Sequence, residues 1–191
     1  SAIKQGITLV LGGPDGGGPS PMQDYLDTLS KHALGMNMAY LVGHNTIRKR
    51  VMQTDNRPPT PEELEEMKVM VKEAMDAGAF GISTGLKYVP GSFSNVAEVI
   101  ELAKVAATSK GIYTSHLREE GLGLLEAVEE AIMIGRAADI PIVLTHHKAI
   151  GKPMWGASVK TLAMVDSARA IGLDIMMDQY PYTASSTGIS V

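Results

Sequence analysis

The sequence contains no cysteine among its 191 residues. Without thiols it can form neither a disulfide framework nor a thiolate metal site, which excludes the small disulfide-rich secreted proteins. Positive charge is not in excess either, because 17 Lys and Arg stand against 21 Asp and Glu, for a formal net charge of -4. A chain with this balance has no field that would hold phosphates along a groove, so we expect no nucleic-acid partner.

Long apolar runs are also missing. The apolar stretches are only strand-sized, whereas a helix that crosses a membrane needs about 18 or more consecutive apolar residues. We therefore expect no membrane association. Residues 1–4 show neither a Met nor the charged-then-apolar pattern of a signal peptide. The lack of cysteine leaves the compartment undecided, and we expect a cytoplasmic location.

Short β-rich runs, which we expect to be buried on both faces, recur at regular spacing along the chain. They cover residues 7–11, 38–42, 80–83, 112–115, 142–145 and 173–177. Most of the segments between them have helical periodicity. The clearest start signal is Thr60-Pro61-Glu62-Glu63, a capping box with Pro at the first helical position, which predicts a helix that ends at Gly78. Further apolar stripes begin at Val96, Leu124 and Val159, the last including Leu162 and Val165.

Strand and helix alternating in this way is typical of βαβ units on a parallel sheet. About six strands are present, which is fewer than the eight of a closed barrel. A doubly wound nucleotide-binding sheet is disfavoured. The glycine-rich run 12–18 follows a strand, but it has neither the G-x-G-x-x-G spacing nor the Lys-Ser/Thr pair of the nucleotide fingerprints.

Polar residues follow each predicted strand, at the edge of a parallel sheet where chemistry normally occurs. In chain order they are Asp15, His44, Ser83-Thr84, His116, His146-His147-Lys148 and Asp178-Gln179-Tyr180. Imidazoles with a carboxylate are a ligand set that suits zinc. Any single histidine could instead cap a loop. Alternation along a strand allows only one of His146 and His147 to face such a site, and the pattern leaves open which.

Several motifs taken together resemble a known family. They are Gly6-Ile7-Thr8, Gly81-Ile82-Ser83-Thr84-Gly85-Leu86 with Tyr88 and Pro90, Thr114-Ser115-His116-Leu117-Arg118 with Glu119, Thr145-His146-His147-Lys148, and Asp178-Gln179-Tyr180-Pro181-Tyr182-Thr183-Ala184. Their order and spacing resemble the N-acyl-D-amino-acid deacylase (D-aminoacylase) branch of the amidohydrolase superfamily, over essentially the whole chain.

The resemblance implies a zinc site with one or two ions. His116 and His146 match histidines that bind zinc in the family. The zinc-binding cysteine of the family aligns with Asp15, so the sequence departs from the pattern at that ligand. A carboxylate oxygen is also an acceptable zinc ligand.

The resemblance also implies an activity. The family hydrolyses the amide bond of N-acyl-D-amino acids, which are small molecules, to a carboxylate and a free D-amino acid. Lys148 and Ser186 match residues that contact the substrate carboxylate, and Tyr180 matches a tyrosine that polarises the scissile carbonyl.

Two parts of the family pattern are not found in these residues: a His-x-His pair on the first barrel strand and an Asp on the last one. We therefore expect residues 1–191 to be the central part of an amidohydrolase catalytic barrel. The expected fold class is α/β, an incomplete (β/α)8 TIM barrel whose six strands correspond to barrel strands 2–7. Such a sheet has two open edges, which favour self-association.

Two other interpretations remain. A cyclic amidase of the dihydropyrimidinase or hydantoinase kind usually has a carboxylated Lys after the fourth barrel strand, but the run 80–86 offers Ser83 and Thr84 and no Lys before Lys87. The other is a catalytically inert piece of barrel. Arg118 and Glu119 are expected either to orient His116 or to form an exposed ion pair.

Overall fold

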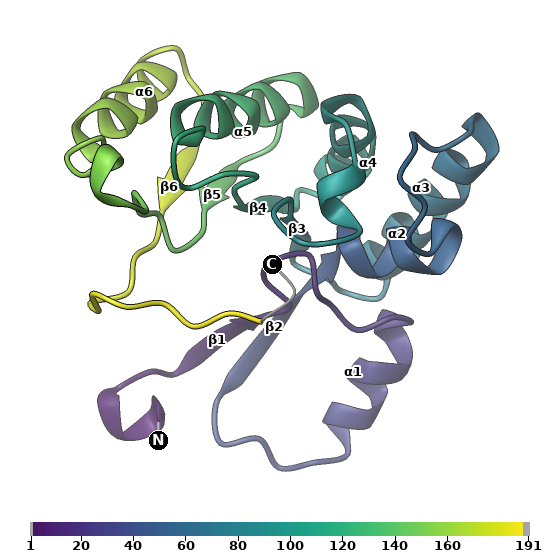
Figure 1. Ribbon diagram of the computed structural model, residues 1–191. Helices are drawn as coiled ribbons and strands as arrows, with labels where there is room; N and C mark the ends of the chain where they lie inside the picture. The colour runs from purple at the N-terminus through teal and green to yellow at the C-terminus, as the bar shows by residue number, and fades with distance from the viewer. Residues whose placement is uncertain (1, 189–191) are drawn as a thin grey trace.

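The computed structural model describes residues 2–188, which form a curled sheet of six parallel strands with helices on its outer side (Figure 1). The strands are β1 (Leu9–Gly12), β2 (Asn37–Gly43), β3 (Gly81–Gly85), β4 (Ile112–His116), β5 (Ile142–Leu144) and β6 (Ile175–Met177). Their order in the sheet is the order in the chain, and every neighbouring pair is parallel. A doubly wound sheet would reverse this order at a switch point, so the topology is that of a partial (β/α)8 barrel, as the sequence predicts.

The helices follow the predicted alternation, with one addition. They are α1 (Met22–Ser30), α2 (His44–Met52), α3 (Pro61–Asp76), α4 (Val96–Thr108), α5 (Leu124–Ala138) and α6 (Ser158–Ala170), with 3-10 turns η1 (Ala2–Gln5), η2 (Gly91–Phe93) and η3 (Lys152–Met154). The predicted capping box is confirmed, because the Thr60 hydroxyl accepts from Glu63 N at 3.2 Å and the Glu63 carboxylate accepts from Thr60 N at 2.7 Å. The sequence predicts a helical segment that includes His32, but α1 ends at Ser30 and His32 lies in the turn after it. The sequence gives no separate signal for α2.

The core lies between the sheet and the helices. Met67 of α3, Leu102 of α4 and Val128 of α5 are fully buried against it. Burial of such a side chain stabilises a fold by about 1.5–3 kcal/mol. The inner face of the sheet is more polar, because alternation along β3 and β4 turns Ser83 and His116 inward.

Two expectations about burial are wrong. The β-rich runs are expected to be buried on both faces, yet Leu9 of the edge strand β1 is 58% exposed and Phe80, just before β3, is 56% exposed. On α6, Val159 and Leu162 were expected to face the core, and they are exposed. That helix instead turns Thr161 and Val165 toward the sheet. Such apolar residues at an edge stay uncovered when no further element packs on them in the described chain.

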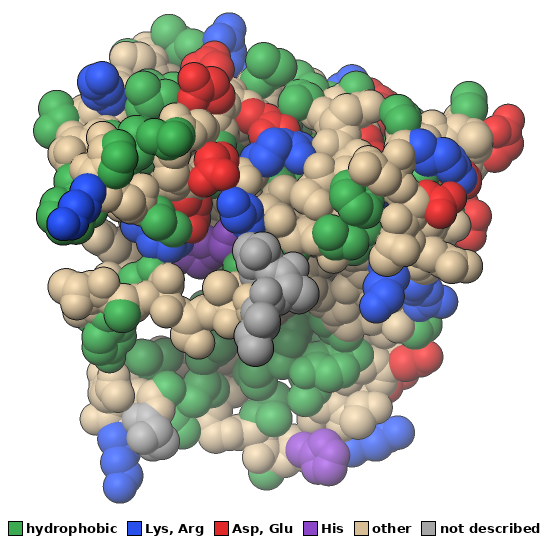
Figure 2. All heavy atoms as spheres, viewed as in Figure 1, with side chains coloured by type: hydrophobic (Ala, Val, Ile, Leu, Met, Phe, Trp, Pro, Cys, Tyr) green, Lys and Arg blue, Asp and Glu red, His purple; other side chains and the backbone are tan. Residues whose placement is uncertain are grey.

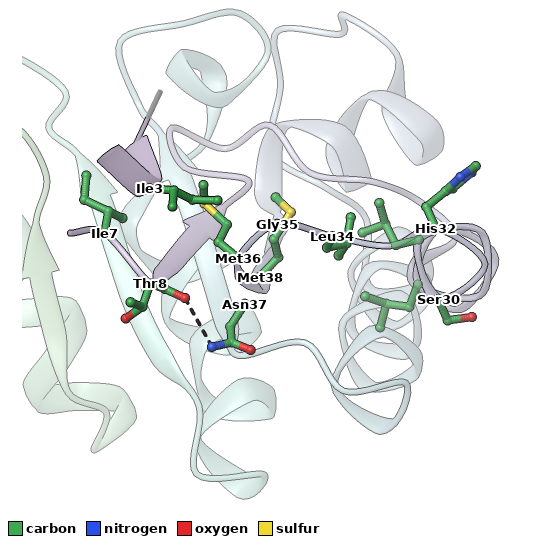
Figure 3. A pocket seen from close by; sticks show the side chains of 12 residues that line it. Ile3, Ile7, Thr8, Ser30, His32, Leu34, Gly35, Met36, Asn37 and Met38 are labelled. Carbon is green, nitrogen blue, oxygen red and sulfur yellow. Dashed lines mark hydrogen bonds between the residues drawn. The ribbon is translucent and has the colours of Figure 1, made fainter. Parts of the chain in front are cut away.

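An apolar groove of about 650 Å³ lies at the amino ends of β1 and β2 (Figure 3). Ile3, Leu34 and Met38 line it, and the Asn37 side-chain amide donates to Thr8 O at 3.1 Å across it. This groove is at the opposite end of the strands from the polar residues described below. None of the helices in residues 2–188 is long and apolar enough to cross a membrane.

Candidate metal centre and substrate cavity

His116 is the last residue of β4, and its side chain is only 7% exposed. It pairs in register with Gly85 of β3, and a Cβ there would meet Asp15 O at 2.1 Å and the Tyr88 ring at 2.9 Å, so the glycine allows both to approach the strand end. The Tyr88 ring packs against the His116 ring with centroids 4.6 Å apart. Strand geometry therefore fixes the position of His116, and the neighbouring tyrosine limits its rotation.

His146 lies just beyond β5, where regular alternation has ended. Its φ is 40°, in the left-handed region, and this turn brings its ring to 4.3 Å from the ring of His116. His147 goes to the opposite side, where its Nε2 lies 2.8 Å from the Thr161 hydroxyl of α6. The question that the sequence left open is thus decided by the turn: His146 faces the inner side and His147 the helix layer.

Asp15 lies in the glycine-rich loop after β1. Its φ is 57°, and Gly16 next to it has φ 76°, a conformation that favours glycine. A Cβ at Gly16 would also meet Asn45 Oδ1 at 2.1 Å. Ser83 of β3 holds both sides of Asp15, since its hydroxyl donates to Gly13 O at 2.6 Å and accepts from Gly16 N at 3.2 Å. The loop therefore places the carboxylate over the ends of the central strands.

Three side chains converge on one point. Asp15 Oδ1 lies 3.3 Å from His146 Nε2 and 3.7 Å from His116 Nδ1, and the three donor atoms are all within 4.8 Å of one another. His116 Nδ1 is buried without a hydrogen-bond partner among the described residues. A buried polar atom of this kind needs a partner, and two imidazole nitrogens with a carboxylate oxygen are a donor set that zinc accepts. The residues present therefore fit a metal ion.

The electrostatics of this cluster favour a charged carboxylate. Burial raises the pKa of Asp15, but the nearby imidazoles of His116 and His146 outweigh burial and hold that pKa well below its usual range. Burial lowers the pKa of His146, whereas its bonds to Asp15 and Glu120 raise it, to about 9. Asp15 is thus ionised next to a cationic imidazole, and a metal ion at this point would take the place of the proton on His146 Nε2.

The cluster forms one wall of a cavity of about 450 Å³. Lys148, Tyr180 and Ser186, which the sequence assigned to substrate, also line it. The Tyr180 ring centre lies 6.5 Å from that of His146 and 5.6 Å from Lys148 Nζ. Figure 2 shows histidine together with Lys and Arg side chains in a hollow on this face of the molecule. The fold therefore brings all six residues named from the sequence to one cavity.

Comparisons with known proteins agree with this geometry. No family model matches the chain. The D-aminoacylase of Alcaligenes xylosoxydans xylosoxydans is 42% identical over 164 residues, which cover 86% of this chain and 34% of that protein. The crystal structure of an N-acyl-D-glutamate deacylase from Bordetella bronchiseptica, complexed with zinc and a phosphonate inhibitor, superposes with a TM-score of 0.89 at 37% identity, covering 94% of this chain and 43% of that one. This chain is similar in sequence and fold to N-acyl-D-amino-acid deacylases, and the crystal structure of one of them, a D-aminoacylase, is described as defining a subset of amidohydrolases.

A second similar structure, of a D-aminoacylase described as having a binuclear metal centre, gives a TM-score of 0.88 at 35% identity, over 94% of this chain and 43% of that one. The chain therefore spans less than half the length of the deacylases that it matches. Its own residues supply one side of a barrel and the cluster described above.

Two candidates from the sequence, His44 and Arg118, lie outside the cluster of Asp15, His116 and His146. His44 starts α2 and is fully buried, with Nε2 2.8 Å from Glu98 Oε1. Arg118 does not orient His116, because its guanidinium binds the Glu130 carboxylate of α5 and the carbonyl oxygens of Ser92 and Ser94. Arg118 therefore ties the loops after β3 and β4 to the helix layer.

Sequence reasoning missed Glu120. Its carboxylate is 8% exposed and lies in the cavity wall between Lys148 and His146. Glu120 follows the Thr114-to-Glu119 motif directly in the chain, so its proximity to His116 was a usable signal. Its neighbour Glu119 binds Lys87 at 3.1 Å, whereas Arg118 binds Glu130, so the exposed ion pair expected between Arg118 and Glu119 is wrong.

Proposed function

We propose that this chain is the metal-holding and substrate-binding part of a zinc-dependent hydrolase that cleaves N-acyl-D-amino acids to a carboxylate and a free D-amino acid. The observation that carries the proposal is the convergence of Asp15, His116 and His146 at the wall of a cavity that Lys148 also lines. The chain's relationship to D-aminoacylases supports the same reaction class. Residues 1–191 would then be the central part of the catalytic barrel, with strands that correspond to barrel strands 2–7.

Asp15, His116 and His146 would hold one zinc ion, and a second ion would need ligands from outside this cluster. Zinc bound there would lower the pKa of a coordinated water toward about 7 and would polarise the acyl carbonyl as a Lewis acid. The role of Ser83 would be to keep Asp15 in place, through its bonds to the backbone on both sides of that residue.

Lys148 would bind the free carboxylate of the substrate. One of its three N–H groups goes to Glu120 and another to His146 O at 3.0 Å. Lys148 Nζ also lies 2.9 Å from His146 Nδ1. When His146 Nδ1 carries a proton it cannot accept from Lys148, so the third N–H of Lys148 is then available to a ligand. With Ser186 on the same cavity wall, Lys148 would fix one end of the substrate and so discriminate the D from the L isomer.

Tyr180 would act on the other end of the bond. Its hydroxyl would donate a hydrogen bond to the acyl oxygen, which gains negative charge as the carbonyl becomes tetrahedral. Addition of one water then breaks the C–N bond, the acyl group leaves as a carboxylate, and the amine takes up a proton. This role makes Tyr180 the catalytic residue among the side chains of the described segment.

Zinc stoichiometry tests the proposal. We expect the variants His116→Ala and His146→Ala each to lose most of the bound zinc. Native mass spectrometry of the wild type and of each variant measures the zinc stoichiometry. His32→Ala is the matched control, since His32 is an exposed histidine in the turn after α1. Unchanged zinc in both cluster variants would contradict the proposal.

The reaction is tested on the whole protein with zinc. Release of free amine from N-acetylated D-amino acids, with the L isomers as controls, should be stereospecific. The cyclic-amidase alternative predicts instead the opening of a hydantoin or dihydropyrimidine. No observation favours it, since Lys87 pairs with Glu119 and Ser83 is engaged by the Asp15 loop. Absence of turnover on any of these substrates would favour the inert barrel.

We also propose that the 191-residue chain self-associates through its sheet edges. β1 and β6 each have one neighbour in the described sheet, and Leu9 and Met176 on them are exposed. Sedimentation of the purified chain should show a species larger than a monomer, and a stable monomer would contradict this. Nucleic acid and membranes are not expected to bind, and the cytoplasmic location stays a prediction that cell fractionation can test.

A further inference from the structure

Glu120 occupies a fixed position between two residues of the proposed site. Its carboxylate Oε1 lies 2.5 Å from Lys148 Nζ and 3.2 Å from His146 Nδ1. The backbone holds it there independently of these charges, because Glu120 O accepts from Ile150 N at 2.7 Å and Glu120 N donates to the Glu119 carboxylate at 3.0 Å. A side chain fixed in this way can orient the groups that it touches.

The two nitrogens of His146 face different partners. Nε2 lies 3.3 Å from Asp15 Oδ1, on the side of the cluster, and Nδ1 lies on the side of Glu120. A neutral imidazole binds a metal through its unprotonated nitrogen, so a metal at Nε2 requires the proton to be on Nδ1. The group that faces Nδ1 therefore selects whether His146 can be a ligand.

Two groups compete for that nitrogen. Lys148 Nζ is 2.9 Å from His146 Nδ1 and can only donate, which favours the tautomer with the proton on Nε2. The Glu120 carboxylate can only accept when ionised, which favours the tautomer with the proton on Nδ1. Glu120 also binds the Lys148 ammonium, so it draws the competing donor toward itself.

Glu120 is not itself placed to be a ligand. Its carboxylate meets His146 at the nitrogen that points away from Asp15, and it is not among the three residues whose donor atoms converge. Its effect on a metal ion would pass through His146.

We propose that Glu120 is a positioning residue, which holds the proton of His146 on Nδ1 and thereby presents Nε2 to the metal while it releases one N–H of Lys148 for the substrate carboxylate. This inference rests on the proposed function, because it assigns a partner to two residues of that site. It adds a carboxylate–imidazole–metal relay in which the same carboxylate also sets the orientation of the substrate-binding lysine.

Zinc affinity of the 191-residue chain, measured by competition with a chelator, tests the relay. Glu120→Ala should bind zinc about 10–100-fold more weakly than the wild type, the loss typical when the partner of a ligating histidine is removed. Glu129→Ala is the matched control, since it removes an exposed glutamate from α5 and should leave affinity within about twofold. Glu120→Gln keeps the side-chain volume and a neutral acceptor, so its zinc affinity should lie between those of Glu120→Ala and Glu129→Ala.

A second readout separates orientation from simple loss of structure. In zinc-loaded chain labelled with nitrogen-15, His146 should show a protonated Nδ1 and a metal-bound Nε2, with His146→Ala used to assign the signals. In Glu120→Ala this Nδ1 proton signal should broaden or disappear, while the His116 signals and the free energy of unfolding stay close to those of Glu129→Ala.

Wild-type zinc affinity in Glu120→Ala, with His146 still needed for binding, would overturn the positioning role and leave the proposed function intact. An unchanged Nδ1 signal would do the same. Failure of the wild-type chain to bind zinc, or zinc binding that survives in both histidine variants, would overturn the proposed function and the relay with it.

Discussion

Two clusters in this molecule combine one carboxylate with histidine, but only one of them is accessible from a cavity. In the first, Glu98 of α4 binds His44 at 2.8 Å and Arg48 at 2.5 Å, and all three side chains are fully buried. In the second, Asp15 faces His116 and His146 beside an open cavity. The same kinds of residue thus form a sealed structural group in one place and an accessible one in the other.

The difference lies in what completes each cluster. Each carboxylate oxygen of Glu98 has its own donor, and Arg48 also donates to the carbonyl oxygens of Asp55 and Arg57. That arrangement neutralises the charge from within the fold. Asp15 has no arginine partner among the described residues, and with His116 and His146 it lines a cavity. Each cluster leaves one buried imidazole nitrogen without a partner in the described residues, His44 Nδ1 in the first and His116 Nδ1 in the second. A carboxylate–imidazole group therefore indicates a binding site when it has no internal counter-charge from an arginine and a ligand can reach it from a cavity.

Breaking the closed cluster should have the largest effect on stability. Glu98→Ala leaves Arg48 buried without its counter-charge, and we expect a loss of about 3–5 kcal/mol in the free energy of unfolding. Urea denaturation measures it. Glu101→Ala, on the same helix but with its side chain 36% exposed, should cost less than about 1 kcal/mol. Equal losses in the two variants would show that the closed cluster is not a special source of stability.

Changing a residue of the cavity beside the open cluster of Asp15, His116 and His146 should affect the reaction rate and leave the free energy of unfolding nearly unchanged. Tyr180→Phe removes a hydrogen bond that is made in the transition state, so kcat of the whole protein should fall about 100-fold or more while KM changes little. Steady-state kinetics on an N-acetyl-D-amino acid would show this. A rise in KM at constant kcat would instead assign Tyr180 to ground-state binding.

Asp15→Cys should sharpen the comparison by changing one ligand atom. A thiolate is softer than a carboxylate, so we expect the preference for zinc over manganese to rise about tenfold or more. Competition binding of the two metals to the native chain measures the ratio. If the ratio does not move, Asp15 does not contact the metal.

The smallest effect concerns pH and the closed cluster. Burial raises the pKa of Glu98, but the bonds from His44 and Arg48 outweigh it and place that pKa below the ordinary value of 4.5. The unfolded chain therefore takes up this proton at a higher pH than the folded chain, so the contribution of Glu98 to stability is complete above about pH 5 and is lost as the pH falls through its folded value.

Glu98→Gln removes the titrating group. The difference in unfolding free energy between the wild type and this variant should shrink as the pH is lowered from about 7 to about 3, by at most about 1.4 kcal/mol per pH unit. Denaturation curves at several pH values give the slope. A difference that grows toward acid pH would reverse the assigned direction of the pKa shift.

The sequence by itself determined the features that depend on neighbours along the chain. The capping box at Thr60 needs only residues within one helical turn, and the alternation of strands and helices follows from local apolar periods. Strand-end position is also local, and it places Asp15, His116 and His146 among the candidates together with His44 and His147, from which the resemblance to the deacylases selects the three.

Only the tertiary structure decided which of these residues meet. A left-handed turn after β5 places His146, and not His147, on the side of the cluster. His44 contacts Glu98 because α2 and α4 bring residues 54 positions apart together. Glu120 reaches Lys148 across two loops. These contacts are set by strand register and loop closure, and neither has a periodic trace in the sequence. The type and local position of each side chain can be read from nearby sequence, but its contact partner depends on how distant elements pack.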